Sequence, residues 1–537
     1  MSRRSVGSIL AVAVVTGILA PVNEPVVSLW PPVAALTVIL ATRHALAGLL
    51  VGGLAGAVLL AGGNPATAVA AVLVEHLWPS LQSSWKLGAI VFTLLLGGFA
   101  AMLEAGGGFT SLMRRVARPG RDQAVQLETA AAGLGILCFF DGLANSMVVG
   151  RVGRDLADRS GVARVKLAYI ADSTSSAVAC VAVISTWIAF QLSMINEAYA
   201  LTGRDVNPYG VFLASLPYNF YCWFTLVLMF VAIRQRFHPG PMGGFAAAAA
   251  SSPPPPEPAV RTDHEPAGKA IASALVPLAV LMVSFFVLFL VLGTPGPVLP
   301  LSRDKVVAAF GSDAGPLVLV LAAVAASLTA AVMFPARGGP RLQPALAAFF
   351  GGMRAMVGPI LILLAAWILG SVIGALGTAE LIAGLASGSG SLVLLPTLVF
   401  LTGAAISFAT GTSWGTMGLL FPLAVPAAVD MGAADGFLPV IVAAVFSGAV
   451  FGDHCSPFSD TTIVTSMSCG VEPHDHVRTQ IPYALITALV AVVLGFLPAG
   501  RGWAAPYSLV LGAGVILLLP ALARRLPGRR SVGSRCS

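Results

Sequence analysis

The sequence is poor in charged residues: only 10% of its 537 residues are Asp, Glu, Lys or Arg, while 57% are hydrophobic. An ordinary soluble domain carries about 25% charged residues. Together with a mean hydropathy of +0.89, this excludes a water-soluble fold. The net charge of +7 does not indicate a nucleic-acid partner, because the basic residues lie in short clusters between apolar runs.

Paired cysteines and enzyme motifs are also missing. The six cysteines have no paired spacing, and four lie in or beside apolar segments, where a thiol behaves as a small hydrophobic side chain. No HExxH or phosphate-binding GKT motif is present. A metalloenzyme site at Asp453, His454 and Cys455 is disfavoured because adjacent helical residues point about 100° apart. We therefore expect no enzyme, no cofactor and no disulfide framework.

Apolar runs of membrane-spanning length recur along the chain. Two examples are KLGAIVFTLLLGGFAAMLEAGG, from Lys86, and IPYALITALVAVVLGFLPAG, from Ile481. A helix needs about 20 such residues to cross a hydrocarbon core about 30 Å thick. The sequence therefore predicts an all-α polytopic membrane protein. The N-terminal run resembles a signal peptide, but in such a protein a first transmembrane helix is the preferred interpretation.

Basic clusters predict the orientation of the spans, since Lys and Arg mark cytoplasmic loops. Arg3 and Arg4, together with the basic C-terminal tail, predict that both termini are cytoplasmic. The regions expected outside the repeats are N-terminal transmembrane helices in 1–85, a cytoplasmic linker rich in Ala and Pro in 236–269, connecting helices in 270–355, and a last helix with a basic tail in 501–537.

Residues 86–235 and 356–500 are predicted to form two repeats of opposite orientation. Each should hold a span, a re-entrant helical hairpin, a broken transmembrane helix and a further span. Basic residues flank the first hairpin, whereas no Lys or Arg flanks the second. This pattern is typical of an inverted-repeat secondary transporter. The expected hairpins cover about 123–150 and about 391–429, and the broken helices about 167–191 and about 437–470.

Short polar runs are expected to interrupt the two broken helices. In the first, ADSTSS from Ala171 should unwind, because such side chains hydrogen-bond a freed backbone. In the second, GDHCSPFSDTT from Gly452 contains Pro457, which lacks a backbone N–H. Gly411 should favour an unwound tip in the second hairpin, because glycine gives the backbone more conformational freedom.

Four aspartates predict an ion site: Asp141 at the expected tip of the first hairpin, and Asp172, Asp453 and Asp460 in the interruptions. A charged side chain at the bilayer centre costs about 2.5 to 3.5 kcal/mol on insertion scales, so four are hard to explain as helix caps. Na⁺ prefers oxygen ligands, and a desolvated carboxylate can instead hold a proton. We therefore expect Na⁺ and H⁺ to bind shared carboxylates in mutually exclusive fashion. The predicted ion-binding residues are Asp141, Asn145, Ser146, Asp172, Ser173, Thr174, Thr410, Gly411, Thr412, Ser413, Asp453, His454, Ser456, Ser459, Asp460 and Thr461, with Na⁺ at the four aspartates and no transition metal.

Other polar residues have simpler interpretations. His454 fits a pH-responsive group and a satisfied core histidine equally well. His476, in EPHDHVR, is expected in a solvated loop rather than in a metal site. Glu104 and Glu128 are expected to be helix caps. Trp414 is expected to be a packing residue.

Four segments also resemble those of a known family. FFDGLANSMVVG, KLAYIADSTSSAVACVAVISTWIAF, FATGTSWGTMGLLFPLAVP and GDHCSPFSDTTIVTS are similar, in this order, to signature segments of the NhaC-type Na⁺/H⁺ antiporters of the ion transporter superfamily. The resemblance runs roughly from Lys86 to Gly500 and implies an inner-membrane sodium-proton antiporter with two hairpins and two broken helices. Related segments often read FDDYAN, whereas here Gly142 follows Asp141, so one carboxylate is absent.

The resemblance leaves the cargo open. The family also contains malate-lactate exchangers, so a Na⁺- or H⁺-coupled transporter of a small organic anion or amino acid is the alternative. Expected partners are Na⁺, H⁺ and the lipid bilayer. The sequence does not determine the oligomeric state, and a homodimer is compatible with it.

Overall fold

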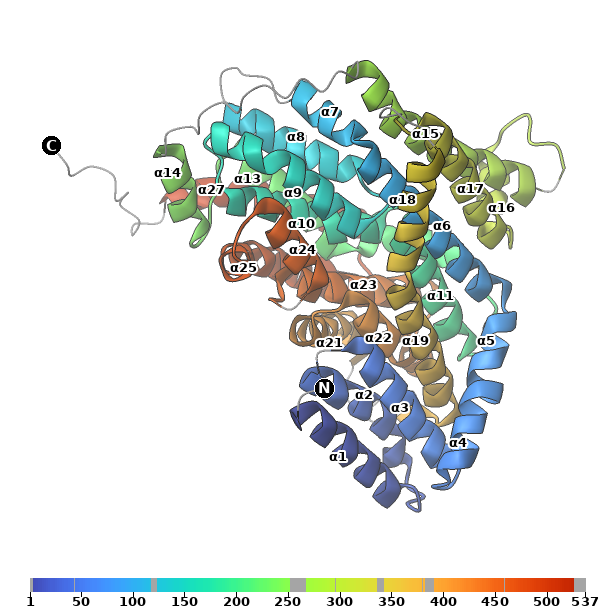
Figure 1. Cartoon of the computed structure of the whole chain (residues 1–537). Helices are drawn as coiled ribbons and strands as arrows, with labels where there is room; N and C mark the ends of the chain where they lie inside the picture. The colour runs from blue at the N-terminus through green and yellow to red at the C-terminus, as the bar shows by residue number, and fades with distance from the viewer. Residues whose placement is uncertain are drawn as a thin grey trace.

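The computed structural model describes residues 3–42, 44–116, 123–251, 267–294, 296–335, 342–378, 380–381, 391–457 and 459–525. Within these ranges the regular structure is helical and no strand occurs (Figure 1). Eight of the described helices are long and apolar enough to cross a membrane, and three bent helix pairs would raise the number to eleven. The prediction of an all-α polytopic membrane protein is confirmed.

The N-terminal helices form a group of their own at the lower end of Figure 1. α1 (Arg3–Leu19), α2 (Trp30–Thr42) and α3 (Ala45–Leu60) pack against one another. α4 (Pro65–Ala71), the π-helical turn η2 (Val72–Leu77) and α5 (Trp78–Gln82) then continue as one rod. This rod is bent by 115° from α3.

The first predicted repeat begins with the long helix α6 (Ser84–Gly106), followed by α7 (Gly108–Val116). A helical hairpin follows, made of α8 (Gln123–Leu137) and α9 (Gly142–Arg159). The next pair, α10 (Arg164–Val181) and α11 (Thr186–Ala200), is bent by 44° at its break. The remaining helices are α12 (Pro208–Ser215), α13 (Phe220–Arg234) and α14 (Met242–Ser251).

The connecting region and the second predicted repeat follow. α15 (Ala267–Gly293), α16 (Arg303–Phe310), α17 (Gly315–Met333) and α18 (Leu342–Ala355) lead into α19 (Val357–Ala375). A second hairpin consists of α21 (Leu395–Thr410) and α22 (Ser413–Asp430), and a second broken helix of α23 (Leu438–Cys455) and α24 (Asp460–Cys469). The chain then forms α25 (Pro473–Val490), η6 (Ala491–Phe496), α26 (Leu497–Gly500) and α27 (Ala505–Arg525).

The broken helices lie in the interior, and the hairpins pack against them (Figure 1). α21 approaches α23 closely because glycines face it: a Cβ at Gly452 would lie 2.2 Å from the backbone nitrogen of Phe408. The first hairpin packs in the same way, since a Cβ at Gly150 on α9 would lie 2.6 Å from Ser468 on α24. The second hairpin therefore packs on α23, the first half of the second broken helix, and the first hairpin packs on α24, its second half.

The predicted unwinding at ADSTSS is wrong. α10 continues through this segment, and the chain breaks at residues 182–185 instead. Thr174 donates to the carbonyls of Ile170 and Ala171 inside the helix, while Ser175 and Ser176 donate to groups on other elements. Because tertiary partners satisfy these hydroxyls, they do not compete for the backbone of α10.

The repeat boundaries and the membrane faces of the helices stay predictions. The predicted break after Asp453 coincides with the gap between α23 and α24. The side chains of Arg3 and Arg4, residues 252–266 of the expected linker and the tail at 526–537 lie outside the described part of the chain.

Candidate functional site

Asp453 lies near the C-terminal end of α23 and is only 1% exposed. Three hydroxyl groups surround its carboxylate. Ser459 Oγ donates to Oδ1 at 2.6 Å, and Ser176 Oγ donates to Oδ2 at 2.8 Å. Thr461 Oγ1 lies 3.3 Å from Oδ2. These hydroxyls come from the break, from α10 and from α24, so the carboxylate joins three segments.

The local sequence explains why this carboxylate faces a break. Pro457 cannot donate a backbone hydrogen bond and cannot continue α23. Ser459 then has an extended backbone before α24 begins at Asp460. The side chain of Ser459 bonds to Asp453 and to Thr461 Oγ1, at 2.6 and 2.8 Å, so the break presents its hydroxyl to the carboxylate.

Asp172, in the middle of α10, has nitrogen donors for partners. Gln480 Nε2 donates to Asp172 Oδ2 at 2.7 Å, and His476 Nε2 lies 3.3 Å from the same oxygen. Both donors belong to α25. Asp172 Oδ1 has no hydrogen-bond partner among the described residues. Asp172 and its two partners are all buried.

His454 and Gln480 link the two carboxylates. His454 Nε2 lies 3.1 Å from Ser173 Oγ, and its Nδ1 lies 2.8 Å from the hydroxyl of Tyr221 on α13. Gln480 Nε2 also donates to the carbonyl of His454. We call this set the aspartate network; its members are Asp172, Ser173, Ser176, Tyr221, Asp453, His454, Ser459, Thr461, His476 and Gln480.

The two carboxylates differ in what they can bind. A serine or threonine hydroxyl can rotate and turn its lone pairs toward a cation, so the groups around Asp453 could become oxygen ligands. An amide N–H or imidazole N–H cannot ligate a cation, so the partners of Asp172 stabilise a negative charge instead. This geometry suits a cation at Asp453 and a fixed carboxylate at Asp172.

The chain is similar to known proteins. The chain matches the model of the Na⁺/H⁺ antiporter family over residues 178–500, more than half of its length. This chain belongs to the Na⁺/H⁺ antiporter family. The resemblance seen in the four sequence segments is thereby confirmed, and the chain is a multi-pass membrane transporter.

The similar proteins include two relatives and one solved structure. An uncharacterized protein of Haemophilus influenzae is 29% identical over 490 residues, covering 89% of this chain and 91% of the relative. The malate-2H⁺/Na⁺-lactate antiporter of Bacillus subtilis is 38% identical over 144 residues, 26% of this chain and 29% of its own. The YdaH transporter of Alcanivorax borkumensis is 17% identical with a TM-score of 0.60, covering 82% of this chain and 90% of YdaH, and shares the fold.

Asp141, predicted as an ion ligand, lies at the tip of the first hairpin. Its Oδ1 accepts from the backbone N–H of Ala144 at 2.7 Å, and its Oδ2 accepts from Thr186 Oγ1 at 2.9 Å. Asp141 therefore caps α9 and attaches the hairpin to the start of α11. No described hydrogen bond joins it to the aspartate network.

Other predicted residues of the first half connect the hairpin with the broken helices. Asn145 Nδ2 donates to the carbonyls of Gly135 and Thr174 at 2.6 and 2.9 Å. Ser146 Oγ accepts from Thr465 Oγ1 of α24 at 2.8 Å. These contacts position α9 against α10 and α24.

The tip of the second hairpin has no described hydrogen bond to the aspartate network. Gly411 has a left-handed backbone (φ 68°), and Thr412 caps α22 by accepting from the N–H of Gly415 at 3.2 Å. Thr410 is bonded within α21, and Ser413 is buried at the start of α22. Trp414 packs against Phe190 with ring centroids 4.4 Å apart, as predicted for a packing residue.

Ser456 and Asp460 lie on either side of Pro457. Ser456 is buried at the end of α23. Asp460 starts α24 with an exposed side chain whose Oδ1 accepts from the N–H of Thr461 at 2.8 Å. Asp460 therefore adjoins the network and is in contact with solvent.

Three simpler interpretations are wrong. His476 is buried in α25 and contacts Asp172. The sequence could not show this contact, because Asp172 lies on another helix. Glu128 lies inside α8 and is paired with Arg236 at 3.3 Å, so it is no helix cap. Glu104, in the last turn of α6, pairs with Arg151 at 3.0 Å. The i, i+4 spacing of His476 and Gln480, directly before the apolar run from Ile481, could have identified the missed face of α25.

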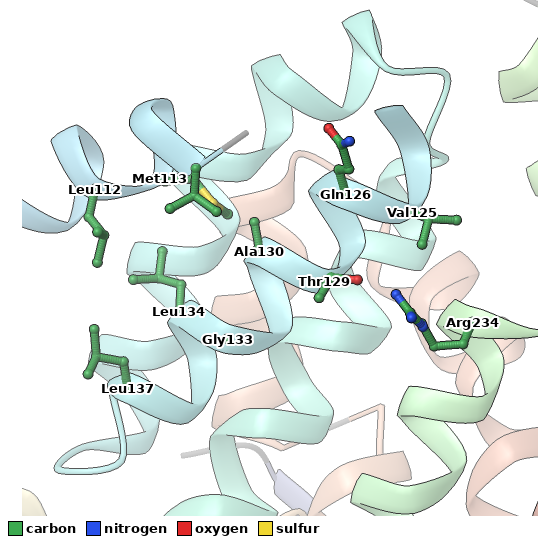
Figure 2. A pocket seen from close by; sticks show the side chains of 11 residues that line it. Leu112, Met113, Val125, Gln126, Thr129, Ala130, Gly133, Leu134, Leu137 and Arg234 are labelled. Atoms are coloured by element: carbon green, nitrogen blue, oxygen red, sulfur yellow. The ribbon is translucent and has the colours of Figure 1, made fainter. Parts of the chain in front are cut away.

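A separate cleft lies between α7 and α8 (Figure 2). Its volume is about 580 Å³, and its lining is mainly apolar. Leu112, Leu134 and Leu137 lie at one end, while Gln126, Thr129 and Arg234 lie at the other (Figure 2). None of the predicted ion-binding residues lines this cleft.

Proposed function

We propose that the chain exchanges Na⁺ for H⁺ across the inner membrane and that both ions use the carboxylate of Asp453. The observation that supports this is the ring of three hydroxyls around one buried carboxylate at a helix break. A buried carboxylate must be compensated by a proton, a cation or hydrogen bonds. Na⁺ and H⁺ can each neutralise Asp453, and one excludes the other.

In this proposal the Na⁺ ligands are Asp453, Ser176, Ser459 and Thr461. Binding Na⁺ requires each hydroxyl to turn its proton away from the carboxylate and to offer an oxygen lone pair. Asp172, held by His476 and Gln480, adds negative potential that favours a cation nearby. The other residues predicted from the sequence position the hairpins and breaks that frame this site.

The breaks suit alternating access. Ser176 lies on α10, whereas Ser459 lies in the break after α23 and Thr461 on α24. A small movement of α24 against α10 would therefore change the number of ligands. The exposed Asp460 at the start of α24 offers a polar path from solvent. We further propose cytoplasmic N- and C-termini, because basic residues cluster at both ends of the chain.

Everted membrane vesicles with an imposed acid interior test this function. Adding Na⁺ should collapse the pH gradient in the wild type, measured with a pH-sensitive dye. Asp453→Asn should abolish the collapse, because an amide holds neither the proton nor the charge that Na⁺ needs. The matched control is Asp155→Asn, whose side chain is 75% exposed and should leave the exchange unchanged. No collapse in the wild type from mildly acidic to alkaline pH would overturn the proposal.

A second candidate function is Na⁺-coupled exchange of a small organic anion. It is favoured by the similarity of 144 residues to a protein named as a malate-2H⁺/Na⁺-lactate antiporter. Uptake of radiolabelled malate or lactate into proteoliposomes, with and without a Na⁺ gradient, decides between the two. Na⁺-dependent uptake would establish the second function, and its absence beside Na⁺-driven proton flux would retire it.

A further inference from the structure

A second group of buried charges lies beside the aspartate network, at the N-terminal end of α10. Lys166 is only 1% exposed, and its Nζ has no hydrogen-bond acceptor among the described residues. It lies 5.0 Å from the ring centroid of Tyr169 and 5.2 Å from that of Tyr483. An ammonium held only by aromatic faces is poorly compensated, so this amine can readily exchange a proton.

The groups that face Lys166 come from four segments. Glu128 on α8 is 2% exposed; its Oε1 lies 3.3 Å from Arg236, and its Oε2 has no partner among the described residues. The side chain of Arg236 is 43% exposed and lies where the cluster meets solvent. The titratable and charged groups around Lys166 are Glu128 of α8, Tyr169 of α10, Arg236 and His238 after α13, and Tyr483 of α25.

A polar seam connects this cluster with the aspartate network. Lys166, Tyr169 and Asp172 are spaced by three residues, so each is the neighbour of the next in a row along α10. His476, Gln480 and Tyr483 share a face of α25 in the same way. The two faces meet, because the rings of Tyr169 and Tyr483 stack at 4.0 Å while Gln480 bonds Asp172 at 2.7 Å.

Buried polar atoms without a protein partner are concentrated in this seam. Fifteen such side-chain atoms occur in the described part of the chain; five of them belong to the seam and two more to the cluster around Lys166. Buried polar atoms normally have a hydrogen-bond partner. Several neighbouring atoms without a protein partner therefore indicate positions for water or for a transported ion. The seven atoms are Glu128 Oε2, Lys166 Nζ, Tyr169 OH, Asp172 Oδ1, His238 Nδ1, His476 Nδ1 and Gln480 Oε1.

We infer that Lys166 and Glu128 form the proton route between the aspartate network and the cytoplasmic surface. This inference rests on the proposed function, since it assigns a path to the proton of that exchange. A proton that Na⁺ displaces from the network is taken up by the neutral amine of Lys166, which becomes an ammonium. Lys166 passes it to the carboxylate of Glu128, and Glu128 releases it to water beside Arg236, which restores both groups.

The Tyr169 hydroxyl and seam water bridge the gap between the network and Lys166. Residues 166 and 172 are separated by about 9 Å along the helix axis, too far for direct transfer. The route ends at the predicted cytoplasmic side, because α10 begins after the basic segment containing Arg151, Arg154 and Arg159.

The test compares two reactions of the full-length protein in proteoliposomes. Na⁺-driven proton flux needs the route, whereas exchange of radioactive Na⁺ for Na⁺ at equal pH needs only the ion site. Lys166→Met and Glu128→Gln should each slow the proton flux at least about a hundredfold, the lower end of the effect of a lost proton-transfer group. Both variants should keep Na⁺/Na⁺ exchange. Lys166→Arg should not restore the proton flux, because a guanidinium does not release its proton.

The control variant is Lys269→Met, an exposed lysine at the start of α15, which should change neither reaction. Unchanged proton flux in both Lys166→Met and Glu128→Gln would overturn the inference. A proton flux in Lys166→Arg equal to that of the wild type would also overturn the inference, since the positive charge alone would then be sufficient. Equal loss of both reactions in both variants would indicate a structural role. A wild type without Na⁺-driven proton flux would instead refute the proposed function.

Discussion

At the scale of single residues, the buried carboxylates differ in their hydrogen-bond partners, and this difference is the basis of the proposed ion exchange. Asp453 is surrounded by hydroxyls, which can serve as donors to the carboxylate or as ligands to a cation. Asp172 is held by amide and imidazole N–H groups, which can only donate in this geometry. Asp141 satisfies one oxygen with a backbone N–H and the other with Thr186. Of these three carboxylates, Asp453 is the one whose described side-chain partners are all hydroxyls, so every one of them could change its role if Na⁺ binds.

Asp141→Asn should be tolerated much better than Asp453→Asn. Asparagine is as good a helix N-cap as aspartate, and its carbonyl oxygen can still accept from the N–H of Ala144. We expect the variant to fold and to keep Na⁺-driven proton flux within a few-fold of wild type, measured in the everted-vesicle assay. Complete loss of exchange with normal expression and normal melting temperature would show instead that Asp141 ligates the ion.

Among the helices, a close backbone contact near the site joins α21 to α23. A Cβ at Gly452, one residue before Asp453, would lie 2.2 Å from the backbone nitrogen of Phe408 and 2.4 Å from Ser407 Cβ. Ser407 Oγ also donates to the carbonyl of Ala449 at 2.7 Å. The second hairpin therefore sets the position of the end of α23 from which the carboxylate projects.

Gly452→Ala should destabilise the protein and impair exchange together, because backbone atoms cannot move aside as a flexible side chain can. Overpacking of this kind typically costs about 1 to 3 kcal/mol. The melting temperature of the detergent-solubilised protein measures the effect. Gly514→Ala in α27 is the matched control, since nothing lies within 4 Å of its added Cβ, and it should be neutral or stabilising. An unchanged melting temperature for Gly452→Ala would contradict the described contact.

At the scale of the whole molecule, the structural features that depend on local sequence were predicted correctly. Apolar length predicted the helical membrane fold, and Pro457 between polar neighbours predicted the break beside Asp453, with Ser459 and Thr461 nearby. The sequence could not show which distant helix supplies a partner. The hydroxyls of ADSTSS were expected to unwind α10, yet Ser173 and Ser176 bond to His454 and Asp453 instead.

The seam between α10 and α25 was missed for the same reason. Lys166 follows a segment rich in charge, and His476 lies within the polar segment EPHDHVR. The sequence therefore favours solvent-exposed positions for both side chains. They are buried because α25 packs on α10 more than 300 positions away, which brings His476 to Asp172 and Tyr483 to Lys166. Helix periodicity identifies a polar face, but not the helix that covers it.

The most direct test of the account is binding of radioactive Na⁺ to the purified protein from mildly acidic to alkaline pH. If one proton competes for Asp453, the apparent Kd for Na⁺ should rise by up to about tenfold for each unit fall in pH on the acidic side. Asp453→Asn should not bind Na⁺ measurably at any pH. A Na⁺ affinity that does not change with pH, or Na⁺ binding by Asp453→Asn equal to that of wild type, would contradict the shared carboxylate.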